Sequence, residues 1–174
     1  MADNAFWISS LTAGTAVLAS WVTSRGTARA ARIQADASAN TQRTERQRET
    51  RRAAYATFIE QAQHMGELYW KVSDVLRAGD QEEQLPALRD LRFCLRDEYS
   101  RLRHFAWIVA LEGPSEVAVA GETLRRSTTP PYRALLSVIE GDTDAAEMFN
   151  QCYEPYWQSV MIFVEAARTA LQEM

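Results

Sequence analysis

The chain has 174 residues, which is enough for one domain of ordinary size with a buried core. Its formal net charge of −4 excludes the large basic excess that marks many nucleic-acid-binding proteins. Five Trp, six Tyr and six Phe argue against a disordered chain, and only seven Gly and five Pro argue against a turn-rich all-β domain. The composition therefore indicates an all-α protein built from a few long helices.

Residues 1–24 predict a transmembrane helix. No ionisable side chain occurs in residues 4–24, and the apolar centre at 5–22 would be ~27 Å long as a helix. Trp7 and Trp21 lie near its two ends, as aromatic residues do at membrane–water interfaces. The cationic side chains that follow predict a plasma (inner) membrane protein with its N-terminus outside and residues 25–174 in the cytoplasm; these are Arg25, Arg29 and Arg32.

Two alternatives remain for this segment. A cleaved signal peptide would carry positive charge before the apolar run rather than after it, although residues 28–30 have the small-x-small form of a cleavage site. A buried N-terminal helix of a soluble domain is the other alternative, because six Ser and Thr residues between positions 9 and 23 lower the hydropathy. Small residues at helical spacing also predict a face for helix association, with a simple abundance of small residues as the alternative; they are Ser10, Gly14, Thr12, Ala16 and Ser20.

Residues 25–52 predict a basic helical stalk. They contain eight Arg and three acidic residues, whereas residues 53–174 contain eleven basic and 19 acidic ones. Anionic lipid headgroups attract each Arg near the surface by about 1 kcal/mol, while the acidic neighbour and the lack of interleaved aromatic residues argue against nucleic acid. A solvated helical spacer is favoured over a coiled coil, because the heptad positions are mostly polar; they are Ala30, Ile33, Ala37, Asn40, Thr44, Gln47 and Arg51.

Residues 53–174 predict a cytoplasmic antiparallel bundle of three long and two short helices. Apolar residues recur there at steps of three and four, which is the spacing of amphipathic helices. We expect a polar loop at residues 81–84, a break at residues 127–131, and a kink or split of the last helix at Pro155. The expected helices cover about residues 54–78, 85–112, 115–126, 132–140 and 143–171.

No sequence motif indicates an enzyme. The chain has no Gly-rich phosphate loop, no Gly-x-Ser-x-Gly and no His-Glu-x-x-His. Cys94 and Cys152 lack Cys-x-x-Cys spacing and are expected to be reduced thiols packed as small apolar residues. His64 shares a helix face with Glu60 and Glu67, but the second copy of this pattern that a di-metal bundle needs is missing from the sequence. We therefore expect no enzymatic activity, no metal and no cofactor.

These observations predict a single-pass membrane protein whose bundle is an interaction or scaffold module, with self-association included. The expected partners are the lipid bilayer with its anionic headgroups, and another protein or a second copy. One alternative is an effector whose transmembrane helix perturbs the bilayer when the bundles cluster, and another is a helical metalloprotein. The predicted partner surface, whose aromatic members would otherwise close one end of the core, comprises Arg125, Arg126, Arg133, Tyr153, Tyr156 and Trp157.

Overall fold

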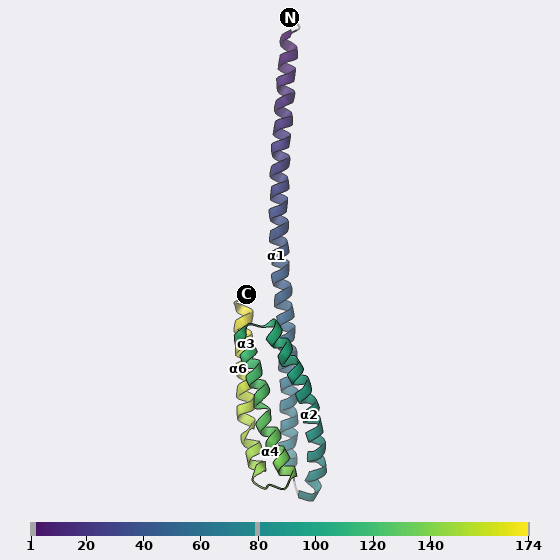
Figure 1. Cartoon of the computed structure of the whole chain (residues 1–174), viewed down its shortest axis with the longest axis vertical. Helices are drawn as coiled ribbons and strands as arrows, with labels where there is room; N and C mark the ends of the chain where they lie inside the picture. Colours follow the sequence, from purple (N-terminus) through teal and green to yellow (C-terminus); the bar gives the residue numbers. More distant parts are fainter. Residues whose placement is uncertain (1–2, 79–80, 174) are drawn as a thin grey trace. The chain divides into compact units, whose positions relative to one another are not determined.

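The computed structural model describes the backbone of residues 3–78 and 81–173, and the side chains of residues 29, 31–78 and 84–173. This part of the chain forms six helices and no strand, so the all-α prediction is confirmed. The helices are α1 (Asp3–Arg77), α2 (Gln81–Glu112), α3 (Ser115–Ser127), α4 (Thr129–Ile139), α5 (Ala145–Gln151) and α6 (Tyr153–Gln172) (Figure 1).

The chain divides into two compact units between Arg46 and Gln47. In the first unit, residues 31–46 of α1 are all exposed. The second unit is the helical bundle, and it includes the end of the predicted stalk: Arg48 donates a hydrogen bond to the Leu171 carbonyl at 3.1 Å, and Arg51 donates one to the Glu112 carbonyl at 2.6 Å. The bundle therefore begins before residue 53, where the charge pattern placed its start.

The bundle consists of four helical segments that alternate in direction (Figure 1). The first segment is the C-terminal part of α1, and the second is α2. Helices α3 and α4 follow one another along the third, and α6 is the fourth. In chain order the short helix α5 lies between α4 and α6, and it packs against α4. A helical bundle is thus confirmed. Helices α3 and α4 are the two expected short helices, and the last expected helix is divided into α5 and α6, which adds one short helix to the expected set.

Proline positions explain most of the differences in helix boundaries. Pro155 lies in the first turn of α6, where a missing N–H leaves no helical hydrogen bond unmade, so the predicted split is confirmed. Pro130 and Pro131 occupy the start of α4 in the same way, and α4 therefore begins at Thr129 rather than at Tyr132. The expected polar loop at residues 81–84 is wrong, because α2 begins at Gln81 and contains Pro86 near its N-terminus.

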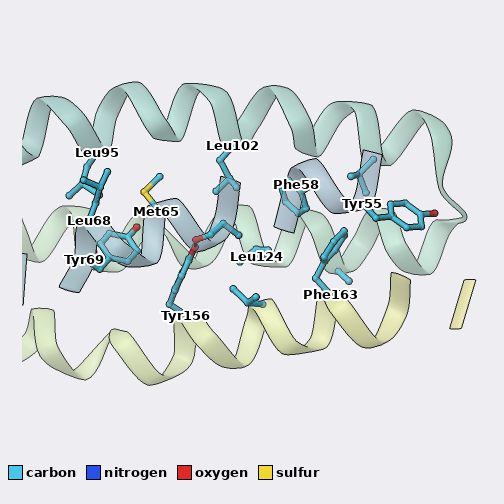
Figure 2. Close-up of a cluster of buried hydrophobic side chains, with 14 of the residues drawn as sticks. Tyr55, Phe58, Met65, Leu68, Tyr69, Leu95, Leu102, Leu124, Tyr156 and Phe163 are labelled. Carbon is cyan, nitrogen blue, oxygen red and sulfur yellow. Dashed lines mark hydrogen bonds between the residues drawn. The ribbon is translucent and has the colours of Figure 1, made fainter. Parts of the chain in front are cut away.

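All six helices contribute side chains to the core. Figure 2 shows a cluster in which labelled side chains of α1, α2, α3 and α6 point toward one another. Aromatic rings meet edge to face at its centre: the ring centroids of Phe58 and Phe163 lie 4.7 Å apart, and those of Tyr69 and Tyr156 lie 5.1 Å apart. Such pairs contribute about 0.5–1.5 kcal/mol each beyond the burial of their area. The predicted apolar stripes are confirmed by the buried positions on α1 and α2, which include Tyr55, Phe58, Ala62, Met65, Tyr69, Val72, Leu88, Leu95, Leu102 and Val109.

Within the described residues, no helix is both long and apolar enough to cross a membrane. The side chains of the predicted transmembrane segment lie outside the described residues, as do Trp7, Trp21 and Arg25 at its predicted interfaces. Arg29 and Arg32 are described, and both are exposed. The predicted helix-association face also lies outside the described side chains: Ser10, Gly14, Thr12, Ala16 and Ser20.

Candidate functional site

Two of the predicted surface arginines pair with a carboxylate of their own helix. Arg125 Nε lies 2.7 Å from Glu122 Oε2, and Arg126 Nε lies 2.7 Å from Glu122 Oε1. The hydrogen bond from Arg125, helped by Arg126 and opposed by partial burial, lowers the pKa of Glu122 to about 2. Arg125 also donates a hydrogen bond to the Tyr99 hydroxyl and is largely buried. Arg125 is therefore a structural residue, whereas Arg126 and Arg133 are exposed.

The predicted aromatic surface is partly core. Tyr156 is 0 % exposed, and its hydroxyl donates a hydrogen bond to the Ala62 carbonyl. Burial raises the pKa of Tyr156, so the hydroxyl stays protonated as this donor. The assignment of Tyr156 to a partner surface is therefore wrong, and its alternative role in the core is confirmed. Tyr153 and Trp157 are half-buried, and Tyr153 lies 5.9 Å from the exposed Trp70 ring, measured between centroids.

A groove of about 520 Å³, the α1–α2 groove, is lined by His64 together with Glu60 and Glu67 of α1 and Glu98 of α2. Its buried centre is Glu98, which is only 8 % exposed and accepts hydrogen bonds from Gln61 at 2.6 Å and from Arg101 at 3.0 Å. His64 Nδ1 lies 3.4 Å from Glu67 Oε2, and His64 Nε2 lies 3.7 Å from Glu98 Oε1. The sequence pattern that placed His64 beside Glu67 was correct, but it did not identify Glu98, which comes from another helix.

The cluster around His64 does not form a metal centre in the described structure. No group of three or more His, Cys, Asp or Glu side chains placed to hold a metal ion occurs among the described residues. The two nearest carboxylates approach opposite ring nitrogens of His64, and Glu98 is occupied by Gln61 and Arg101. Cys94 is exposed and Cys152 is half-buried, so Cys94 does not have the buried position expected of it.

A second groove of about 540 Å³, the α2–α4 groove, lies where α2 passes the joint between α3 and α4. One sequence pattern corresponds to this groove: Arg96, Ser100 and Arg103 recur at steps of four and three, which places them on one face of α2. The lining contains two arginines and three tyrosines: Met65, Tyr69, Leu95, Arg96, Tyr99, Ser100, Arg103, Thr128, Thr129 and Tyr132.

A third groove of about 540 Å³, the α3–α6 groove, lies between the start of α3 and the end of α6. Its lining combines apolar or small side chains with three glutamates: Pro114, Glu116, Val117, Ile162, Glu165, Ala166, Thr169, Ala170 and Glu173. Ile162 is 57 % exposed, so part of this apolar surface faces solvent. Neither this groove nor the α2–α4 groove contains any member of the predicted partner surface.

Comparison of the chain with protein-family models, with curated proteins and with solved structures finds no match in any of the three.

Proposed function

We propose that this chain is a single-pass membrane protein whose cytoplasmic bundle binds another protein through the α3–α6 groove. The anchor is proposed from the sequence, because residues 4–24 carry no ionisable side chain and Arg25, Arg29 and Arg32 follow them. The binding role is proposed from the surface of the bundle. The chain thus joins a partner protein to the cytoplasmic face of the membrane.

The observation that supports binding is the chemistry of the α3–α6 groove. Val117, Ile162 and Ala166 provide an apolar floor, while Glu116 and Glu173 add carboxylates to the lining. A third carboxylate, that of Glu165, lies 3.5 Å from the exposed guanidinium of Arg168. Surface pairs of this kind contribute little and leave Glu165 able to bind another cation.

These features fit an amphipathic helix with basic residues beside its apolar face. A helix of this type places its apolar side chains in a groove, and its Arg or Lys residues pair with carboxylates at the edge. Residues 53–174 contain 19 acidic and eleven basic residues, which favours a basic partner over an acidic one. Residues 25–52 of a second copy would supply eight Arg but only Ile33 as a large apolar side chain, so we assign the groove to a different protein.

The membrane anchor is tested by fractionation and protease protection. We expect the full-length chain in the membrane pellet, extractable only with detergent, and the bundle inaccessible to protease added from outside the cell. A variant without residues 1–24 is expected in the soluble fraction. A full-length chain that is soluble without detergent would show that the N-terminal helix packs against protein instead.

Binding at the α3–α6 groove is tested in cells with a photo-crosslinking amino acid at Thr169, which lines the groove. The control position is Met148 on α5, which is exposed outside the groove. We expect an adduct from position 169 only, mapped to a helix with basic residues beside an apolar face. Charge reversal of the rim with E116K, E165K and E173K should remove it. An adduct only to a second copy, or one that survives charge reversal, would contradict the proposal.

A further inference from the structure

The α2–α4 groove has an apolar interior of the size of a small-molecule site. Met65 and Leu95 contribute buried apolar side chains, and Tyr99 and Tyr132 contribute half-buried rings. Its volume of about 540 Å³ lies within the range of pockets that bind one small organic molecule. Its residues come from α1, α2 and the joint between α3 and α4, so the groove exists only in the assembled bundle.

Hydrogen bonds hold the inner side of this groove in place. The Tyr69 hydroxyl donates to the Thr128 carbonyl at 3.2 Å, and Thr128 Oγ1 donates to the Arg125 carbonyl at 2.7 Å. Burial raises the pKa of Tyr69 well above its ordinary value, which keeps the hydroxyl protonated. The Tyr99 hydroxyl accepts a hydrogen bond from Arg125. These groups are used in bonds within the protein, so the groove is preformed and a ligand does not need to order its walls.

Two arginines remain for contact with a ligand. Arg96 and Arg103 lie two turns apart on one face of α2, ~10.5 Å along the helix axis, and their exposed side chains are long enough to reach a common anion from two sides. Among the residues that the structure describes, neither forms an ion pair, and no carboxylate lines the groove. Ser100, between them, donates its hydroxyl to the Arg96 carbonyl at 3.2 Å.

We infer that the α2–α4 groove binds a small amphipathic anion, namely a carboxylate or phosphate monoester with an aromatic or aliphatic body. The body packs on the half-buried rings of Tyr99 and Tyr132, and the anionic group binds Arg96 and Arg103 through charge-assisted hydrogen bonds. In an acidic bundle, these two guanidinium groups favour an anion at this groove. The α3–α6 groove shares no residue with this site, so the inference does not rest on the proposed partner.

The test is a calorimetric titration of the full-length chain in non-ionic detergent with 1-naphthyl phosphate. Two control ligands separate the contributions: 1-naphthol has the same body without the charge, and inorganic phosphate has the charge without the body. We expect 1-naphthyl phosphate to bind at least about tenfold more tightly than either control. The double variant R96Q/R103Q should raise its Kd about tenfold or more, while leaving the Kd of 1-naphthol unchanged.

A matched variant, R89Q/R92Q, makes the same change of charge on the same helix outside the groove lining. It should leave the Kd of 1-naphthyl phosphate unchanged. Equal losses in both double variants would show that only the overall charge of the bundle matters, and no loss in R96Q/R103Q would remove the arginines from the site. Equally tight binding of 1-naphthol or of inorganic phosphate would overturn the amphipathic ligand class.

Discussion

The α1–α2 groove and the α2–α4 groove are both lined by helix α2, yet they use their charged groups differently. In the α1–α2 groove, the carboxylate of Glu98 accepts hydrogen bonds from Gln61 and Arg101 and lies near His64. In the α2–α4 groove, Arg96 and Arg103 form no ion pair within the described part of the chain. The two grooves have similar volumes, but the carboxylate of the α1–α2 groove is bonded to the protein, whereas the arginines of the α2–α4 groove are left for a ligand.

The contrast between Glu98 and the two arginines indicates which charged residues stabilise the bundle and which can bind a ligand. A buried charge such as Glu98 must be satisfied by the protein, and its partners are then fixed. An exposed arginine is satisfied by water and exchanges water for a ligand at little structural cost. Substitution of Glu98 in the first groove should therefore change the free energy of unfolding, whereas substitution of Arg96 and Arg103 in the second should change ligand binding.

The largest expected effect is on the core at the inner side of the α2–α4 groove. Leu95 is 1 % exposed on α2, so L95A should lower the free energy of unfolding by about 2–5 kcal/mol through lost burial and a residual cavity. L111A, on the same helix at 83 % exposure, should change it by less than about 0.5 kcal/mol. Urea denaturation followed by circular dichroism measures both. Similar losses in the two variants would contradict the packing of α2 described above.

The next effect concerns the buried carboxylate of the α1–α2 groove. E98A removes the carboxylate acceptor of Gln61 and Arg101 and should cost about 1–3 kcal/mol, because the Gln61 amide keeps only its longer hydrogen bond to the Glu98 backbone carbonyl, at 3.4 Å. E60A changes an exposed glutamate in the same groove and should cost less than about 0.5 kcal/mol. The same denaturation experiment compares them, and an equal cost would mean that Glu98 is satisfied by solvent rather than by the protein.

A smaller effect depends on pH and involves the ion pair between Glu122 and Arg125 on α3. The folded-state pKa of Glu122 is about 2, below its ordinary value of 4.5, so its contribution to stability is present above about pH 4.5 and is lost as the pH falls toward 2. Because Glu122 is partly exposed, E122Q should cost only about 1 kcal/mol near neutral pH. The difference from the unmodified chain should shrink in denaturation near about pH 3. A constant difference across this range would contradict the pairing.

The smallest expected effect on stability comes from the α2–α4 groove itself. R96Q/R103Q removes two exposed charges that form no ion pair among the described residues, so the free energy of unfolding should change by less than about 0.5 kcal/mol. A stability change this small, together with the expected loss of ligand binding, would show that the two arginines serve binding and Glu98 serves stability. A loss comparable to that of E98A would place the two arginines among the structural residues.

Helix periodicity predicted the core because burial follows the spacing of apolar residues along each helix. Tyr55, Phe58 and Met65 follow one another at steps of three and seven, which places them on one helix face, and all three are buried. Spacing also placed His64 beside Glu67 on one helix. The division of the last helix before Pro155 followed from the missing N–H of proline.

The grooves were not predicted because each is formed by residues from different helices. Glu98 carries no sign in the sequence that its carboxylate faces Gln61, and Arg125 resembles Arg126 until the structure shows its contact with Tyr99. Tyr156 has a polar hydroxyl and an apolar ring, and the choice between surface and core depends on the Ala62 carbonyl of another helix. Such contacts depend on helix packing, which a local pattern does not contain.

The joint between α3 and α4 also constrains the order of folding. Prolines at 130 and 131 lack the amides that would continue the helical hydrogen bonding of α3, and the hydroxyls of Ser127 and Thr128 donate to the carbonyls of Leu124 and Arg125 in its last turn. These bonds are local, but the bond from Tyr69 to Thr128 joins residues 59 positions apart. The angle of this joint is therefore set only after α1 has reached it. Helix α3 can form from local interactions, whereas the α2–α4 groove is completed only when α1 and α2 have met the joint between α3 and α4.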